Sequence, residues 1–385
     1  MGQVLQLARR GEGRVSPNPM VGCVVVKEGK VISTGYHEQY GGFHAERNAL
    51  LNCPEDTAGA ELYVNLEPCC HYGKTPPCTE IIIEKKIRKV YVGCLDSNPK
   101  VAGKGIEILR EHGIEVETGI LEKECRALNE IFFYYIEKKL PFVAMKYAMT
   151  LDGKIACESG DSKWVTGAKA RGYVQCLRNR YRGIMAGIGT VLADDPMLNC
   201  RMENGRDPVR ILCDARLRMP LDSQIVKSAH QIETIVAWNP KSAEEWRKQP
   251  AGQGQTETLE ETKRELEKQN VILLEIPMEK GKKGSGQLDL SILLQKLAER
   301  GIDSILLEGG GTLNASALTK GLVQRVYAFV APKLVAGAGA KSPVEGTGIL
   351  QMKDAVMLQH TEFSRYGEDL CITGRIGGET CSPES

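Results

Sequence analysis

The sequence predicts an α/β protein made of two domains. Short apolar stretches such as 21–26 and 304–307 have the length of strands, and helix-like stretches separate many of them. The chain has 385 residues, and a domain usually holds roughly 100–200 residues. A Lys-Leu-Pro sequence at 139–141 follows a charged stretch. We therefore expect one domain over residues 1–140 and a second over residues 141–385.

The first domain is expected to hold a hairpin and a mostly parallel sheet. The turn at 28–30 joins two strand-like stretches at its ends, as in a tight hairpin. Helix-like stretches separate the later strands, which favours a parallel arrangement covered by helices. The expected strands are 21–26, 31–35, 61–66, 89–93 and 114–117, and the expected helices are 44–51, 79–86, 104–112 and 122–138.

The second domain repeats the α/β pattern. Residues 240–287 are rich in Lys, Glu, Gln and Gly of mixed charge, which indicates a solvated helix near 259–268 with loops around it. The first strand is not followed by Gly-x-Gly-x-x-Gly, so a Rossmann domain is not indicated. The expected strands are 142–147, 183–186, 209–213, 234–237, 271–276, 304–307 and 326–331.

Charge and composition narrow the class of protein. Lys and Arg total 50 against 49 Asp and Glu, and the net charge of +1 lacks the basic excess typical of nucleic-acid-binding proteins. The apolar stretches are too short to span a bilayer, and no signal peptide is evident. The 13 cysteines are odd in number and scattered, which favours reduced thiols. We expect a cytoplasmic protein that binds neither nucleic acid nor membrane.

A zinc-activated water is the chemistry that the first domain indicates most strongly. His44 and Glu46 form a His-x-Glu pair, and Cys69 and Cys78 follow on either side of a loop. One His and two Cys can hold zinc with three ligands and leave the fourth position for water, whose pKa the metal lowers. A nearby Glu can then move the proton, as in zinc-dependent base deaminases.

Two helix starts test this interpretation. Residues two apart in a helix lie about 200° apart, so His44 and Glu46 can converge only in a first turn. The Gly-Gly pair at 41–42 places a helix start there, and Pro-Pro at 76–77 places Cys78 at another, where the dipole favours a thiolate.

The spacing of the cysteines leaves alternatives open. Eight residues separate Cys69 from Cys78, whereas a generic deaminase has Pro-Cys-x-x-Cys. Cys70 is a rival ligand, although Cys69 holds the Pro-Cys position. A structural zinc site or buried free thiols are the other readings of the same residues.

Glycine-rich turns indicate an anion site in the second domain. The strand at 304–307 runs into Glu-Gly-Gly-Gly-Thr at 308–312 and a helix-like stretch, and Gly-Ile-Gly-Thr at 187–190 also follows a strand. Backbone N–H groups and a helix dipole favour a phosphate at such turns. Lys146 lies on an expected strand that ends in an Asp-Gly turn. The local sequence alone favours a solvent-facing lysine there.

Several segments resemble one family, the bifunctional deaminase-reductase of riboflavin biosynthesis. In the first domain they are 16–22 (Ser-Pro-Asn-Pro-Met-Val-Gly), 44–46 (His-Ala-Glu) and 66–78, and in the second they include 145–154 and 164–167. The long gap between the cysteines is this family's own spacing. The resemblance implies a cytidine-deaminase-like N-terminal domain and a C-terminal domain similar to dihydrofolate reductase.

By position, the resemblance implies a deaminase site in the first domain. His44, Cys69 and Cys78 would bind Zn²⁺, and Glu46 would be the catalytic proton shuttle. The substrate would be 2,5-diamino-6-(ribosylamino)-4(3H)-pyrimidinone 5′-phosphate, which loses its 2-amino group by hydrolysis. Its pyrimidine, ribose or phosphate would be contacted by Asn18, His37, His71 and Lys74.

The resemblance implies an NADPH-dependent reductase in the second domain. The opened ribose would be reduced at C1, giving 5-amino-6-(5-phosphoribitylamino)uracil, with Lys146 and Asp194 orienting the sugar and relaying a proton. The cofactor would be bound by Ala148, Trp164, Thr190, Asp194, Gly310, Gly311, Thr312, Leu313, Asn314, Ala315 and Ser316. The phosphorylated substrate would be bound by Ser162, Arg178, Leu198, Arg201 and Glu308, where the guanidinium forks suit a phosphate.

The favoured reading is a multifunctional hydrolase and oxidoreductase that deaminates first, acts on a small phosphorylated pyrimidine and forms a homo-oligomer. A deaminase that acts on nucleic acid needs a basic surface and aromatic side chains that stack on bases. The net charge of +1 and the aromatic content of 5% argue against this class. A non-catalytic zinc-binding module is a second alternative, but it does not require a glutamate such as Glu46 beside three zinc ligands. A chain with one inactive domain is a further reading, although each implied position holds a chemically suitable residue.

Overall fold

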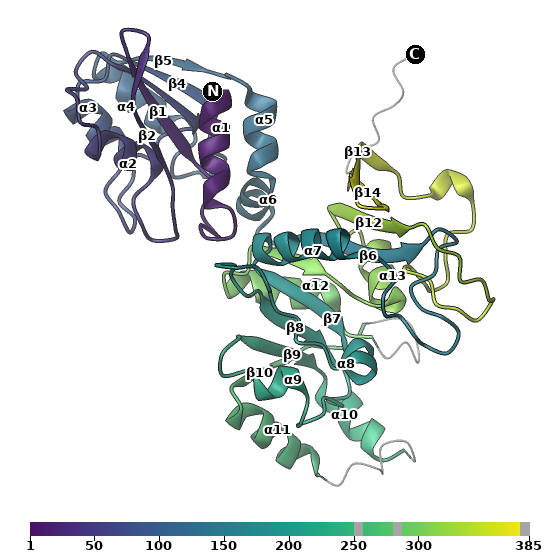
Figure 1. Cartoon of the computed structure of the whole chain (residues 1–385). Helices are drawn as coiled ribbons and strands as arrows, with labels where there is room; N and C mark the ends of the chain where they lie inside the picture. The colour runs from purple at the N-terminus through teal and green to yellow at the C-terminus, as the bar shows by residue number, and fades with distance from the viewer. Residues whose placement is uncertain (250–256, 280–286, 378–385) are drawn as a thin grey trace. The chain divides into compact units, whose positions relative to one another are not determined.

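The computed structural model describes residues 1–249, 257–279 and 287–377. The chain divides into two compact units, Met1–Leu140 and Pro141–Ser385, which are described here one at a time (Figure 1). No helix in the described ranges is long and apolar enough to cross a membrane.

The first unit holds a five-stranded sheet in the order β2-β1-β3-β4-β5. Its strands are β1 (Gly22–Lys27), β2 (Lys30–Tyr36), β3 (Glu61–Leu66), β4 (Lys89–Cys94) and β5 (Glu115–Thr118). The expectation of a mostly parallel sheet is wrong, because β1 pairs antiparallel with β2 and with β3, and only β3-β4 and β4-β5 are parallel. The hairpin turn forces the first of these pairs, and β3 adds to the free edge of β1.

Helices accompany the sheet of the first unit. They are α1 (Gly2–Ala8), α2 (Ala45–Leu51), α3 (Cys78–Glu84), α4 (Lys104–Glu111), α5 (Glu122–Leu128) and α6 (Glu130–Lys138). The single helix expected over 122–138 is wrong, because the chain breaks at Asn129. The buried Asn129 amide accepts a bond from the Met20 N–H and donates one to the Met20 carbonyl, so it serves a distant segment at the break.

The second unit holds a nine-stranded sheet in the order β10-β9-β8-β7-β11-β6-β12-β14-β13. All neighbours from β10 to β12 are parallel, and the last two pairs are antiparallel. The strands are β6 (Phe142–Thr150), β7 (Gly183–Gly187), β8 (Val209–Cys213), β9 (Thr234–Trp238), β10 (Val271–Glu275), β11 (Ser304–Leu307), β12 (Arg325–Ala331), β13 (Leu358–Tyr366) and β14 (Asp369–Ile376).

The helices of this unit connect the parallel strands. They are α7 (Ala168–Arg180), α8 (Ile188–Asp194), α9 (Gln224–Lys227), α10 (Pro240–Arg247), α11 (Leu259–Lys268), α12 (Leu290–Glu299) and α13 (Gly311–Thr319). Helix α11 has the expected place, and a capping box of Thr258 and Glu261 explains its start. The stretch expected as helix and loops also contains α10, while residues 250–256 and 280–286 lie outside the described residues.

Strands β13 and β14 were not expected from the sequence. Strand β13 is exposed over nearly its whole length, and Phe363 in its middle is 66% exposed. A strand with no buried face lacks the apolar alternation on which prediction rests.

The order of the central strands brings the sequence signals of the second unit together. Strand β11 lies between β7 and β6, and Leu307 at its end pairs with Met145 and with Met185. Glu308 therefore follows β11 directly beside Lys146 of β6, and its N–H donates to the Met185 carbonyl at 2.9 Å. The turns after β7 and β11 both open at the carboxyl edge of the sheet, where α/β proteins bind ligands.

Candidate active sites

The metal-binding residues of the first unit converge. Ligand atoms of His44, Cys69 and Cys78 lie within 4.8 Å of one another. The His44 Nδ1 atom is 3.4 Å from the Cys69 Sγ and 3.6 Å from the Cys78 Sγ. One imidazole and two thiols match a zinc site that keeps a position open for water. The three side chains therefore fit the metal by number, chemistry and spacing.

The two expected helix starts explain this convergence and are confirmed. His44 is the residue just before α2, and the helix begins at Ala45, so Glu46 lies in its first turn. Helix α3 begins at Cys78, directly after Pro77. Each start delivers a side chain to the same point from a different helix.

Glu46 and the cysteines have perturbed protonation. Glu46 is 2% exposed, its Oε2 has no hydrogen-bond partner among the described residues, and burial raises the pKa of Glu46 to about 7. A hydrogen bond from the Cys78 thiol lowers the pKa of Cys69 to about 4. The Cys78 N–H also donates to the Cys69 Sγ at 3.3 Å, so the cluster favours a thiolate at Cys69.

Cys70 lies apart from the cluster. Its thiol is 3.6 Å from the Lys100 carbonyl, and it is not among the three side chains whose ligand atoms meet. Cys69, and not Cys70, therefore contributes the second thiol of the cluster.

A cavity of about 250 Å³ adjoins the metal-binding residues. His37 holds its place through a contact of its Nε2 with the Asn18 amide at 3.1 Å and of its Nδ1 with the Phe43 carbonyl at 2.9 Å. The Lys74 ammonium lies 3.9 Å from the centre of the Tyr40 ring. All four expected substrate contacts line this cavity, namely Asn18, His37, His71 and Lys74, together with His44, Glu46 and Cys69.

Two further lining residues were missed by the sequence reasoning. Asp96 and Asn98 follow β4 and line the same cavity. Burial raises the pKa of Asp96 to about 6, and its carboxylate accepts the Asn98 N–H at 2.7 Å. A signal was available, because β3 and β4 are parallel neighbours and their following loops open at one edge of the sheet.

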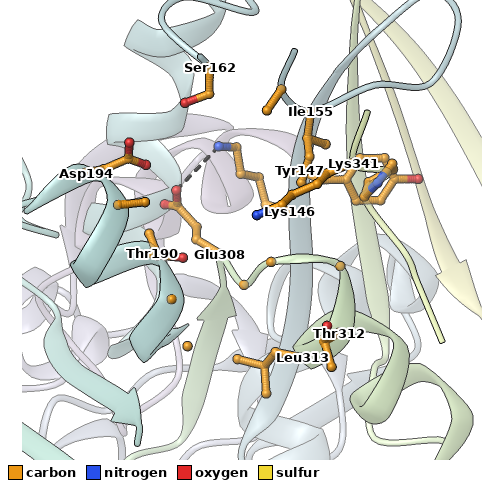
Figure 2. A pocket seen from close by; sticks show the side chains of 18 of the residues that line it. Lys146, Tyr147, Ile155, Ser162, Thr190, Asp194, Glu308, Thr312, Leu313 and Lys341 are labelled. Atoms are coloured by element: carbon orange, nitrogen blue, oxygen red, sulfur yellow. Dashed lines mark hydrogen bonds and ion pairs between the residues drawn. The ribbon is translucent and has the colours of Figure 1, made fainter. Parts of the chain in front are cut away.

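The second unit holds a larger cavity of about 840 Å³ at the carboxyl edge of its sheet. In Figure 2, Asp194 and Thr190 lie to the left of Glu308 and Lys146, Ser162 lies above them, and Thr312 and Leu313 lie below, in the first turn of α13. A cavity of this volume is large enough for a cofactor or a drug-sized ligand.

Lys146, Arg178 and Glu308 form a buried ion cluster in this cavity. Their side chains are 14%, 13% and 11% exposed. The Arg178 Nε and a terminal nitrogen donate to the two Glu308 oxygens at 2.8 and 3.2 Å, and the Lys146 Nζ donates at 3.4 Å. Burial alone would raise the pKa of Glu308, but the two cations outweigh it and lower this pKa to about 2.

The cluster changes how these residues are understood. Lys146, which reads as solvent-facing in the sequence, is largely buried and paired. Arg178 already holds Glu308 in a two-point contact and donates to the Asn199 carbonyl at 2.9 Å. Two cations around one carboxylate leave a surplus of positive charge, which favours an anionic ligand.

Most of the expected reductase residues line this cavity, and three do not. Leu198 is packed in the core, Asn314 is fully buried, and Ala315 lies one residue further along α13. Direct contact of these three with a bound molecule stays a prediction. The expected residues that do line it are Lys146, Ala148, Ser162, Trp164, Arg178, Thr190, Asp194, Arg201, Glu308, Gly310, Gly311, Thr312, Leu313 and Ser316.

The glycine turns fit a dinucleotide cofactor. A Cβ added at Gly310, just before α13, or at Gly189, in the first turn of α8, would meet no atom of the described residues within 4 Å, so the backbone at both helix starts is open. Helix α13 begins directly after Gly310, and α8 begins at Ile188 directly after Gly187. Open backbone at two helix starts suits the pyrophosphate of NADPH.

Comparison with known proteins matches both units. Residues 1–94 match the model of the cytidine and deoxycytidylate deaminase zinc-binding region, and residues 141–372 match that of the RibD C-terminal domain. The riboflavin biosynthesis protein RibD of Actinobacillus pleuropneumoniae is 49% identical over 97% of this chain and 93% of its own length.

Solved structures agree over the whole length. RibD of Acinetobacter baumannii (form 1) superposes with a TM-score of 0.83 at 35% identity, covering 98% of each chain. A Thermotoga maritima structure described as a diaminohydroxyphosphoribosylaminopyrimidine deaminase/5-amino-6-(5-phosphoribosylamino)uracil reductase gives 0.80 at 37% identity, covering 98% of this chain and 97% of that one.

The two sites and these matches define the class of protein, a bifunctional enzyme with a zinc-dependent deaminase and an NADPH-dependent reductase in one chain. More particularly, the chain belongs to the RibD family of riboflavin biosynthesis. The expected cytidine-deaminase-like and reductase folds, both enzyme classes and both cofactors are thereby confirmed.

Proposed function

We propose that the first unit removes the 2-amino group of a diaminopyrimidinone ribosyl phosphate and that the second reduces the ribosyl chain of the product. The Thermotoga maritima relative carries both activities in its description. The observation that carries the proposal is the meeting of His44, Cys69 and Cys78 beside the buried Glu46 at the wall of a cavity. On this basis residues 1–140 form the deaminase domain and residues 141–385 the reductase domain.

In the deaminase, Glu46 is the group that moves the proton. His44, Cys69 and Cys78 would hold the zinc, which would supply an activated water for attack on the ring carbon. A buried carboxylate whose pKa is near neutral can take a proton from water and pass it to the leaving amine, which departs as ammonia. Asn18, His37, His71 and Lys74 hold the pyrimidine and its ribosyl phosphate from the surrounding walls.

In the reductase, the chain positions the substrate and supplies a proton. NADPH, when bound, brings the hydride. Lys146 lies beside Glu308 within the cavity, and Asp194 lies at the end of α8 on the same wall. We assign the binding of the phosphorylated sugar to the positive surplus around Glu308 together with Ser162 and Arg201, and proton transfer to Lys146 and Asp194.

Ammonia release by the zinc-loaded protein tests the deaminase assignment. Glu46→Gln is expected to lower the rate by at least about a hundredfold, the scale of a lost proton-transfer group, with one zinc per chain retained. Glu84→Gln, on the exposed face of α3, is the matched control and should behave as wild type. A Glu46→Gln variant that still releases ammonia at the wild-type rate would remove Glu46 from the chemistry.

We also propose that the chain forms a homo-oligomer through the edge of β13 that pairs with no strand of the described residues. Phe363 is 66% exposed there, and Leu350, Met352 and Met357 just before the strand are 95%, 89% and 72% exposed. An open strand edge flanked by exposed apolar side chains is a surface that a second copy can cover. Light scattering should show an oligomer that Phe363→Glu dissociates and Val31→Glu, at an exposed position of the other unit, does not. A wild-type monomer would contradict this.

We propose a cytoplasmic location, supported by the odd number of cysteines and their scattered positions along the sequence. Cell fractionation tests it, and recovery of the protein outside the cytoplasmic fraction would refute it.

A further inference from the structure

A loop segment crosses the first turn of α13 at the wall of the reductase cavity. We call residues 341–346 the strap. The Glu345 N–H donates to the Gly311 carbonyl at 3.1 Å, and the Asn314 amide donates to the Pro343 carbonyl at 2.8 Å and to the Gly309 carbonyl at 3.3 Å. The buried Asn314 therefore joins the strap to the glycine turn.

The strap is also held at its start, by the segment that follows β6. The Ile155 N–H donates to the Lys341 carbonyl at 2.9 Å, and the Lys154 ammonium donates to the Ala340 carbonyl at 3.3 Å. Ile155 and Lys341 line the cavity, as Figure 2 shows, and so does Glu345. With contacts at both ends, the strap has a defined place against α13.

Gly311 is required by the strap. A Cβ at Gly311 would lie 2.5 Å from the Glu345 Cγ and 2.7 Å from the Ser342 carbonyl oxygen, far inside van der Waals contact. A Cβ at the preceding Gly310 would meet no atom of the described ranges within 4 Å. The two glycines therefore have different roles. Gly310 leaves room towards the cavity, and Gly311 leaves room for the Glu345 side chain.

This packing sets a negative charge beside an anion site. The Thr312 hydroxyl lies 3.5 Å from the Glu345 Oε2, within hydrogen-bond reach. Thr312 and the neighbouring backbone form the start of α13, where the helix dipole and free N–H groups favour a phosphate. A phosphate bound here competes with Glu345 for the Thr312 hydroxyl and is repelled by the carboxylate.

We propose that Glu345 determines cofactor affinity by holding a carboxylate against the phosphate-binding turn, so that the site binds NADPH more weakly than it would without this charge. The inference rests on the proposed function, in which this turn binds the cofactor phosphates. Like charges a few ångströms apart at a partly exposed site change an equilibrium constant by about tenfold.

Calorimetric titration with NADPH tests the role of Glu345 without relying on activity. Glu345→Gln keeps the size of the side chain and should bind NADPH about tenfold more tightly than wild type. Inorganic pyrophosphate should compete for the site with its affinity raised by a similar factor. The gain should shrink in high salt, because mobile ions screen the repulsion.

Glu158→Gln is the matched control, since Glu158 approaches Gly337 and Gly339 of the same connection but does not line the cavity. It should leave NADPH affinity unchanged. If wild type binds NADPH and Glu345→Gln binds it equally or more weakly, the proposed role of Glu345 is wrong. Weaker binding by Glu345→Gln would mean that the carboxylate accepts a hydrogen bond from the cofactor. If no variant bound NADPH, the assignment of the cavity itself would fall, and the inference with it.

Discussion

Neutralising Glu308 is expected to weaken the reductase unit by about 3 kcal/mol at neutral pH. Glu308→Gln leaves the shape of the side chain but removes the charge that Arg178 and Lys146 share at 2.8–3.4 Å. Both cations are largely buried, so water cannot replace the lost partner fully. Removing one member of a buried charge pair typically costs about 3–5 kcal/mol.

The same magnitude follows from protonation. The neighbouring cations lower the pKa of Glu308 from 4.5 to about 2, and each pH unit is worth about 1.4 kcal/mol, which gives about 3 kcal/mol. Because the folded-state pKa lies below the unfolded one, this stability is fully present above about pH 4.5 and is lost as the pH falls towards about 2.

Tryptophan fluorescence can isolate the effect. All three tryptophans, Trp164, Trp238 and Trp246, belong to the second unit, so urea unfolding followed by their emission reports on that unit alone. The difference in the free energy of unfolding between wild type and Glu308→Gln should stay constant from pH 7 to pH 5. It should become smaller below about pH 4.5.

The matched control is Glu299→Gln, an exposed position at the end of α12, where we expect a change within about 0.5 kcal/mol. A decrease in the free energy of unfolding of less than about 1 kcal/mol for Glu308→Gln would refute the reasoning. A decrease that is as large near pH 2 as at pH 7 would refute it as well. Either result would mean that the charge of Glu308 is not what stabilises the cluster.

Three further predictions follow from the same geometry. Cys70→Ser should retain zinc, measured as metal per chain, whereas Cys69→Ser should lose it; zinc loss in the former would make Cys70 a ligand. Gly310→Ala should weaken NADPH binding in calorimetry at unchanged stability, and Gly311→Ala should lower stability, because only the second added methyl meets protein atoms; equal stability in both would contradict the packing. Arg210→Met should cost about 3 kcal/mol or more in tryptophan-monitored unfolding, since the fully buried guanidinium serves several carbonyl and hydroxyl oxygens; a loss under about 1 kcal/mol would show that these groups find other partners.

Local signals account for what the sequence predicts well. The metal-binding residues follow from a Gly-Gly pair before His44 and a Pro-Pro pair before Cys78, and both determine helix starts within a few residues. The parallel strands of the second unit are similarly marked by short apolar stretches, because burial on both faces leaves a continuous pattern.

The features that escape prediction depend on distant segments. Lys146 reads as solvent-facing because its partner Glu308 is far along the chain, and only the register of β6 with β11 brings them together. Strand β13 has no buried face to reveal it. Asn129 breaks a helix because its amide bonds to Met20, more than a hundred residues earlier. Each of these is set by tertiary contacts.

The central claim is that one chain carries two successive activities, and a combined assay tests it most directly. Wild type, Glu46→Gln and Lys146→Met would be given the diaminopyrimidinone ribosyl phosphate with and without NADPH, and ammonia and NADPH would be followed together. We predict that wild type releases ammonia without NADPH and oxidises NADPH only after deamination. Glu46→Gln should do neither, and Lys146→Met should release ammonia normally while oxidising NADPH slowly. Absence of ammonia from zinc-loaded wild type, or NADPH oxidation by Glu46→Gln at the wild-type rate, would contradict the claim.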